Sequence, residues 1–339
     1  MTKLMRSASL DGFVPLARSF GLDPYRLIDQ AGIPRACLTN SELKISSTAY
    51  CRLLDAAGSA AHADDFGVRL AESRQLSTFG PVGLVMREQP TVRRAIAALV
   101  EHIRLHNESA FLELEEMDDV VIVKPRLEVA LSVPLQQGKG MILGVMCRIL
   151  TLLLGPSWRP ESVCFVSAPP QSLASHWRVF GRKLEFNQAF SGIVCLRRDI
   201  DRSIAGSDPG LAREAERYVE LLAPRRQSTA RETVRAIVLT LLPIGQCTVE
   251  RVSQHLGVNR RTLHRQLSVQ KTTFSALVDS VRAELSVSYV EESDRSFASI
   301  AELLGFAAQS SFAHWHNSRF GMSASARREG SGRGLERTR

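Results

Sequence analysis

The spacing of apolar residues changes along the chain. In residues 1–223, stretches with helical spacing, such as 92–106, occur beside short alternating or apolar stretches at 111–117 and 120–124. Helices repeat their apolar positions every three to four residues, whereas strands alternate or are apolar over a short run. The two short stretches therefore predict a β-hairpin. From residue 230 onward every apolar stretch has helical spacing, so the pattern predicts an α/β amino-terminal domain and an all-α carboxy-terminal domain.

The longest apolar run, residues 141–155, predicts a buried helix rather than a membrane span. Arg148 interrupts this run, which is shorter than the roughly 20 apolar residues that a spanning helix needs. Residues 1–16 carry charges and no sustained apolar segment, unlike a signal peptide. We therefore expect a cytoplasmic protein with no membrane partner.

Two segments of the carboxy-terminal part, 248–268 and 299–321, each carry the pattern of a helix-turn-helix unit. A small residue lets two helices approach, and a glycine tolerates the positive φ that ends the first helix. One such pattern is weak, because many helical hairpins share it, but two joined by the helix-like stretch 274–290 are specific. In both segments an apolar and a small residue precede a Leu-Gly pair: Val252-Ser253 before Leu256-Gly257, and Ile300-Ala301 before Leu304-Gly305.

The second helix of such a unit enters the major groove of DNA with its first residues toward the bases. In the upstream segment this helix is expected to begin near Asn259, with Leu263 and Leu267 facing inward. Arginine binds guanine in a bidentate manner and also binds phosphate. We predict base contacts from Arg261 and Arg265 and, more weakly, His264, and phosphate contacts from Arg260 and Thr262. The predicted DNA-binding set of this unit is Asn259, Arg260, Arg261, Thr262, His264 and Arg265.

The downstream segment has one more residue between its glycine and its first inward apolar residue. Gly257 and Leu263 are six positions apart, whereas Gly305 and Phe312 are seven apart. Its exposed face is polar but not basic, so it should bind DNA more weakly and discriminate less. Gln309 suits adenine, and Ser310 and Ser311 suit phosphate. The predicted DNA-binding set of this unit is Gln309, Ser310, Ser311 and His314.

The positive charge is concentrated in the same part of the chain. Residues 224–339 carry 17 Lys and Arg against 10 Asp and Glu, whereas residues 1–223 carry 26 against 25. Phosphate attraction requires such an excess, although a basic surface can also serve solubility. The polar, proline-containing stretch near 224–228 is the predicted linker. The predicted domains are thus residues 1–223 and 229–328, followed by a flexible basic tail at 329–339.

Neither metal nor cofactor chemistry is predicted. The six cysteines are scattered in apolar surroundings without C-x-x-C spacing, as expected of buried thiols in a reducing compartment. The pairs His102/His106 and His314/His316 lack a third ligand at an obvious spacing and are expected to be surface or capping residues. No phosphate loop or nucleophile elbow is present, so an enzyme would need a hidden site in the amino-terminal domain. An architectural DNA-binding protein is the third class, but it would need far less chain.

The carboxy-terminal part resembles the DNA-binding domain of the AraC/XylS family of bacterial transcription regulators. The likeness rests on VSQHLGVNRRTLHRQL at 252–267, Phe274 and Val281-Arg282, IAELLGF at 300–306, QSSF at 309–312 and FGMS at 320–323. The chain departs from the family in three places. His314 stands where arginine is common, His316 where phenylalanine is usual, and Ala324 where proline follows.

Residues 79–107 and 177–194 resemble, less specifically, the long effector-binding domain in one branch of that family. The resemblance implies a transcription activator or repressor that binds double-stranded DNA and acts with RNA polymerase. It also implies an amino-terminal domain that binds a small-molecule effector and often mediates homodimer formation. It names neither the effector nor its binding residues.

Overall fold

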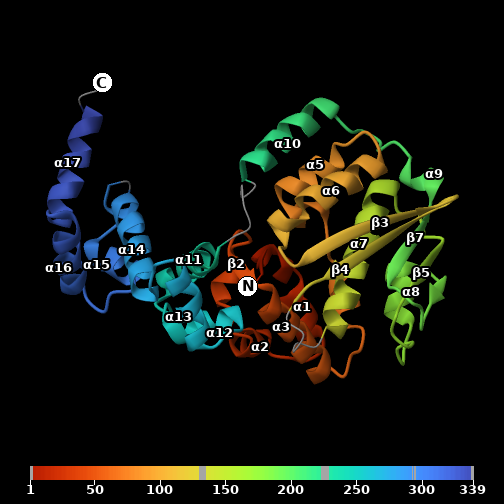
Figure 1. Cartoon of the computed structure of the whole chain (residues 1–339), viewed down its shortest axis with the longest axis horizontal. Helices are drawn as coiled ribbons and strands as arrows, with labels where there is room; N and C mark the ends of the chain where they lie inside the picture. The colour runs from red at the N-terminus through yellow and green to blue at the C-terminus, as the bar shows by residue number, and fades with distance from the viewer. Residues whose placement is uncertain (1–2, 130–134, 223–228, 292, 294, 337–339) are drawn as a thin grey trace. The chain divides into compact units, whose positions relative to one another are not determined.

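A computed structural model describes residues 3–129, 135–222, 229–291, 293 and 295–336. The contacts between residues divide the chain into two compact units, one up to residue 226 and one from residue 227 (Figure 1). The predicted linker, residues 224–228, lies outside the described residues.

The amino-terminal unit begins with a helical layer around a two-stranded antiparallel sheet. Strand β1 (Leu4–Arg6) pairs with β2 (Lys44–Ser46). The side chains of Phe13, Leu54 and Phe66 are fully buried in the core of this layer because they lie on the inward faces of its helices. The other elements of the layer are η1 (Ser7–Leu10), α1 (Phe13–Ser19), α2 (Pro24–Gln30), η2 (Arg35–Leu38), α3 (Ser47–Ala60), α4 (Phe66–Ala71) and η3 (Leu76–Phe79).

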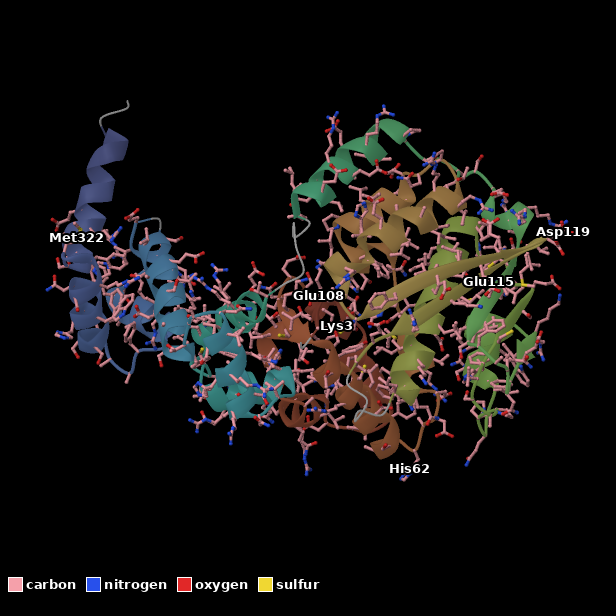
Figure 2. The ribbon with its side chains drawn as sticks, in the orientation of Figure 1. Lys3, His62, Glu108, Glu115, Asp119 and Met322 are labelled. Carbon is pink, nitrogen blue, oxygen red and sulfur yellow. The ribbon has the colours of Figure 1, made fainter. Side chains whose placement is uncertain are left out.

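A mixed five-stranded sheet forms the second layer, in the order β3-β4-β7-β5-β6. The predicted β-hairpin is confirmed as the antiparallel pair of β3 (Ala110–Met117) and β4 (Val120–Leu127). Asp118 has a φ of 33° at the turn, and Asp119 lies at the tip of this long hairpin (Figure 2). The remaining strands are β5 (Ser162–Cys164), β6 (Leu184–Glu185) and β7 (Gly192–Leu196).

Helices cover the sheet, with α6 packed against β3 and α7 against β4. The predicted buried helix at 141–155 is confirmed as part of α7. Among the described residues, α7 is the one helix long and apolar enough to cross a membrane, but most of it is buried in this core. The helices of this layer are α5 (Pro81–Arg87), α6 (Val92–His106), α7 (Gln136–Leu154), α8 (Ala174–Phe180), α9 (Arg197–Ile200) and α10 (Pro209–Leu222).

All the regular elements in the described part of the carboxy-terminal unit are helices, which confirms the predicted all-α domain. The long helix α14 contacts α11, α15 and α17 (Figure 1). Its elements are α11 (Ala230–Leu241), η4 (Leu242–Ile244), α12 (Val249–Leu256), α13 (Arg260–Val269), α14 (Phe274–Glu291), α15 (Phe297–Leu303), α16 (Gln309–Phe320) and α17 (Ala324–Glu336).

Helix α17 continues through Glu336, into the segment 329–339 that the composition predicts to be a basic tail. Long-range contacts hold its first turns in place. The Arg327 Nε pairs with a Glu291 carboxylate oxygen at 2.7 Å. Arg328 donates to the carbonyl oxygens of Val290 and Arg295 at 3.1 and 2.8 Å. These bonds hold the start of α17 in place, although its glycine and serine residues are poor helix formers.

Helices α4 and α7 approach closely because two glycines lie between them. A Cβ added at Gly67 would be 2.1 Å from the Gln137 carbonyl oxygen, and one at Gly144 would be 2.7 Å from the Ala71 Cβ. The Gln137 side chain connects the helices, since its Oε1 accepts from the Gly67 N–H at 2.8 Å and its Nε2 donates to the Ala63 carbonyl oxygen at 3.1 Å. This junction fixes α7 against the helical layer.

We expect Gly67→Ala to lower the free energy of unfolding by about 1–3 kcal/mol, because the new methyl group meets a backbone oxygen that cannot move freely. Urea unfolding followed by tryptophan fluorescence measures the change. Ser59→Ala, at an exposed position of α3, is the matched control and should change stability by less than about 0.5 kcal/mol. Equal stabilities of the two variants would contradict the close approach.

Candidate nucleic-acid interface

The first helix-turn-helix unit is built by local hydrogen bonds around Gly257. Thr248 caps α12 by accepting from the Arg251 N–H at 3.2 Å. Gly257 ends that helix in the left-handed region, with a φ of 68°, and the Val258 N–H returns to the Ser253 carbonyl oxygen at 3.0 Å. This is the turn that a side chain at 257 would strain.

Helix α13 begins after Asn259, whose Oδ1 accepts from the Thr262 N–H at 2.8 Å. Leu263 and Leu267 are fully buried, so the opposite face of α13 is exposed to solvent. The exposed face carries no carboxylate, because residues 260–269 contain neither Asp nor Glu. Of the predicted residues, Asn259, Arg260, Arg261, His264 and Arg265 are exposed and Thr262 is half-buried.

One of these arginines already has an anionic partner within the unit. The Arg260 Nη1 lies 2.8 Å from a Glu250 carboxylate oxygen, and both side chains are more than half exposed. An exposed ion pair of this kind contributes little to stability and is readily exchanged. Arg261 and Arg265 form no salt bridge with the described residues, so α13 presents them without a competing carboxylate.

The second unit repeats this construction with a longer turn. Ser296 caps α15 by accepting from the Ser299 N–H at 3.2 Å, and Gly305 has a φ of 68°. Helix α16 begins four residues after its glycine, whereas α13 begins three after Gly257, which confirms the extra residue. Ala308 stands at the N-cap of α16 and provides no side-chain hydrogen bond. The predicted residues Gln309, Ser310, Ser311 and His314 are all exposed.

The connector α14 holds the second unit through two polar side chains that sequence reasoning did not assign. The Arg282 guanidinium donates to the carbonyl oxygens of Leu304 and Gly305 at 2.9 and 3.0 Å. It also lies over the Phe306 ring, 4.4 Å from the centroid. The Trp315 Nε1 donates to Asp279 at 2.5 Å, which ties α16 to the same helix. The partners of Arg282 lie 22 and 23 residues further along the chain, so no local pattern indicates this role.

The expectation that His316 is a surface or capping residue is wrong, because it is fully buried among the rings of Phe312, Trp315 and Phe320. Its Nδ1 donates to the Met322 carbonyl oxygen at 3.0 Å, while Nε2 has no hydrogen-bond partner. Met322 lies just after the end of α16 (Figure 2). Burial lowers the pKa of His316, and the bond to Met322 opposes that shift. A neutral imidazole thus replaces a wholly apolar ring in the core of the second unit.

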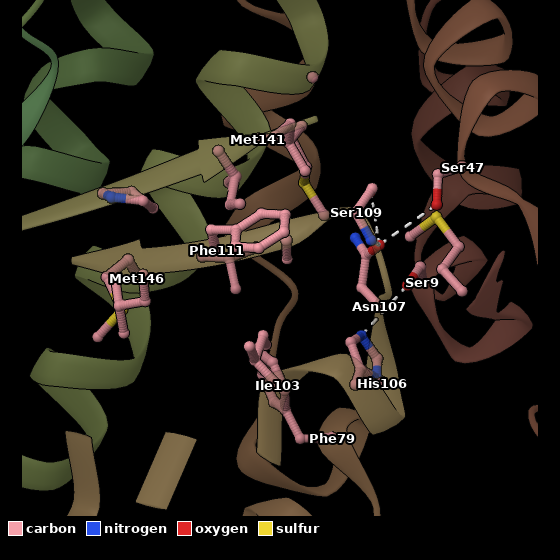
Figure 3. A pocket seen from close by; sticks show the side chains of 18 of the residues that line it. Ser9, Ser47, Phe79, Ile103, His106, Asn107, Ser109, Phe111, Met141 and Met146 are labelled. Atoms are coloured by element: carbon pink, nitrogen blue, oxygen red, sulfur yellow. Dashed lines mark hydrogen bonds between the residues drawn. The ribbon is translucent and has the colours of Figure 1, made fainter. Parts of the chain in front are cut away.

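The amino-terminal unit contains an apolar cavity between its helical layer and its sheet (Figure 3). Ile103, Phe111 and Met146 lie at one side of it, and Ser9, Ser47 and His106 lie at the other. The expectation that His106 is a surface or capping residue is wrong. It is buried against Phe79, with Nε2 3.2 Å from the Ser9 Oγ. No sequence signal identified this site, because its walls come from widely separated segments.

The cysteines are free thiols, and five of the six are buried. Burial raises the pKa of Cys37, Cys51 and Cys147 to about 12. Such thiols stay protonated at neutral pH, as expected for small apolar core residues. Within the described ranges, no group of three or more His, Cys, Asp or Glu side chains has an arrangement that could hold a metal ion.

Two family profiles match the chain. The profile described as the arabinose-binding domain of AraC transcription regulator, N-terminal, matches residues 21–204, which is more than half of the chain. The profile of a helix-turn-helix domain matches residues 252–330. The chain belongs to the AraC/XylS family of transcription regulators, so its carboxy-terminal unit is a DNA-binding domain.

Two curated relatives are similar over nearly their whole length. The HTH-type transcriptional regulator VirS of Mycobacterium tuberculosis is 27% identical over 322 residues, covering 94% of each chain. The ornithine utilization regulator of Pseudomonas aeruginosa is 23% identical over 315 residues, covering 91% of this chain and 92% of its own. The solved structure of the transcriptional regulator CdpR from Pseudomonas aeruginosa matches with a TM-score of 0.43 and 17% identity, over 90% of this chain and 96% of that one.

We expect His316→Phe to stabilise the chain more at acidic pH than at neutral pH. The folded-state pKa of His316 is depressed, so the unfolded chain takes up this proton first as the pH falls below about 6.5, and stability is lost. Phenylalanine removes that loss. Urea unfolding at about pH 7.5 and about pH 5 gives the two free-energy differences from wild type.

Ala313→Ser, at an exposed position of the same helix, is the control without a titratable group. An advantage of His316→Phe that is the same at both pH values would show that proton uptake by the buried ring does not limit stability.

Proposed function

We propose that α13 and α16 are the recognition helices of this regulator and occupy successive major grooves of promoter DNA. The observation that carries the proposal is the exposed face of α13. It presents three arginines and a histidine, without a carboxylate in the helix, on a helix-turn-helix scaffold. Cationic side chains at this position suit both guanine edges and phosphate oxygens.

The two helices are proposed to contribute unequally. Arg261 and Arg265, supported by His264, contact bases, whereas Arg260 and Thr262 contact phosphate. The ion pair between Arg260 and Glu250 supports this division, since a side chain that can exchange one oxygen anion for another suits a backbone contact. Asn259 serves first as the helix cap and lies at the edge of the contact surface.

On α16 the proposed contacts are Gln309 to adenine and Ser310 and Ser311 to phosphate, with His314 beside them. Residues 309–318 contain no Lys, Arg, Asp or Glu, so this helix attracts phosphate less than α13 does. The connector contacts of Asp279 and Arg282 support a fixed distance between the two helices. The first helix-turn-helix unit is therefore expected to dominate affinity.

The remaining assignments follow from the family and are proposals for this chain. The amino-terminal domain, residues 1–223, binds a small-molecule effector and forms a homodimer; a linker at 224–228 joins it to the DNA-binding domain at 229–328. The regulator is a cytoplasmic activator or repressor that contacts RNA polymerase and has no catalytic activity. Its relatives VirS and the ornithine utilization regulator support the regulatory role.

We expect the affinity of the full chain for its promoter DNA to fall steeply with salt, because each phosphate contact releases counterions. With about four cationic contacts, the slope of log affinity against log salt should be near −4. Fluorescence anisotropy at several salt concentrations measures this slope. A slope near zero would contradict an interface built on the arginines of α13.

We expect Arg261→Ala to reduce the preference for promoter over random DNA by about tenfold, because a bidentate base contact contributes about 1–3 kcal/mol of discrimination. Arg260→Ala, its neighbour on the same helix, is the matched control and should weaken promoter and random DNA alike. Competition binding with both DNAs gives the two ratios. The division of roles is wrong if the variants lose discrimination equally.

A further inference from the structure

The cavity in the amino-terminal unit is narrow. Its volume is about 90 Å³, below the roughly 300–1,000 Å³ that ligand pockets commonly enclose, so it suits a slender ligand. Its walls come from the helical layer, from β3 and β4, and from α6 and α7, all within one unit. The site is therefore complete without a second chain.

Most of this wall is hydrocarbon. Ile142 and Val145 are only half-buried although α7 is a core helix, because they face this space. Figure 3 shows Phe111 projecting toward Met141 and Met146. Further apolar side chains that line the cavity are Met5, Leu99, Ile103, Leu112, Leu127 and Ile149. An apolar ligand would bury its surface here without losing hydrogen bonds to water.

A buried arginine lies at the polar side of the cavity. The side chain of Arg74 is almost fully buried. It donates to the carbonyl oxygens of Ala8 and Ser9 at 3.1 and 2.6 Å. Of the carboxylates that the structure describes, none forms a salt bridge with it, whereas Arg6 nearby pairs with Glu42. A buried cation without an anion is costly, so Arg74 leaves positive charge at the wall of an apolar space.

Two buried polar atoms beside Arg74 lack hydrogen-bond partners. These are the Tyr50 hydroxyl and the His106 Nδ1, and both residues line the cavity. Burial and the charges of Arg6, Arg74 and Lys44 lower the pKa of His106 to about 3, so its ring is neutral and adds no positive charge. Two polar atoms without hydrogen-bond partners thus lie beside a cation that forms no salt bridge with the described residues.

Three other polar residues of the wall, Ser47, Asn107 and Ser109, bond to one another. The Asn107 Oδ1 accepts from Ser47 Oγ at 3.3 Å and from the Ser109 backbone and hydroxyl at 2.9 and 2.7 Å (Figure 3). A sugar needs hydrogen bonds around its whole perimeter, and this wall offers them only at the Arg74 side. The lining therefore does not suit the carbohydrate named in the family description.

We propose that this cavity binds an amphipathic monoanion, a carboxylic acid whose hydrocarbon chain fills the apolar side and whose carboxylate reaches Arg74 and Tyr50. The ligand supplies the anion that Arg74 lacks and an acceptor for the Tyr50 hydroxyl. The proposal rests on the proposed role of the amino-terminal domain as the effector sensor, and it names the chemical class of the effector.

The test measures binding of three probes to the full chain by isothermal titration calorimetry: dodecanoate below its micellar concentration, dodecanol, and L-arabinose. Dodecanoate should bind at least about tenfold more tightly than dodecanol, as expected for a charge-assisted contact in a buried site, and arabinose should not bind. Equal binding of dodecanoate and dodecanol overturns the carboxylate part. Binding of arabinose, or of no probe, overturns the proposal.

Three variants locate the site. Arg74→Met should weaken dodecanoate by about tenfold or more and leave dodecanol within about twofold, while Tyr50→Phe should weaken dodecanoate less. Ile142→Trp, which fills the apolar side, should abolish binding of both. Unchanged dodecanoate binding in Ile142→Trp or in Arg74→Met overturns the proposal. If Arg74→Met does not fold, the comparison of dodecanoate with dodecanol in the wild-type chain still decides it.

Promoter binding is measured on the same preparations, which separates the two proposals. Dodecanoate binding without promoter binding would reject the proposed recognition helices and support the cavity assignment. Promoter binding without binding of any probe would overturn the cavity assignment and leave the proposed DNA interface standing.

Discussion

The double hydrogen bond from Arg282 to the end of α15 is the interaction on which the DNA-binding unit depends. The last carbonyl oxygens of a helix have no partner within the helix, and here a guanidinium from the connector supplies one. Because the bond joins α14 to the turn at Gly305, it sets the position from which α16 departs. Asp279 then fixes that helix through Trp315. The spacing of the two recognition helices thus depends on side chains that need not touch DNA.

The sequence predicted the parts of this unit that are determined locally. Glycine at 257 and 305, the Asn259 cap and the extra residue before Phe312 are features of a few neighbouring residues, so their pattern could be interpreted without a fold. The anchoring by Asp279 and the helical course of 329–336 depend on partners far along the chain and could not be predicted. The cavity was missed for the same reason, since no single segment shows that Arg74 and Phe111 face one space.

The amino-terminal domain shows how a family fold can keep its architecture while the chemistry of its interior changes. Its sequence matches the profile of an arabinose-binding domain, yet the wall of its cavity contains methionine, phenylalanine and branched aliphatic residues. A fold determines where a cavity can form, and the side chains lining it determine what enters. In this chain the polar groups are confined to the side where Arg74 and His106 meet η1.

The unequal capping of the two recognition helices has a consequence for promoter evolution. Asn259 holds the first turn of α13, whereas Ala308 leaves the first turn of α16 without a side-chain cap, a difference of about 0.5–2 kcal/mol. The residues proposed to meet bases from α16, such as Gln309, therefore belong to a turn that frays more easily. Across the promoters of one regulon, the half-site facing α16 should then drift in sequence more than the half-site facing α13.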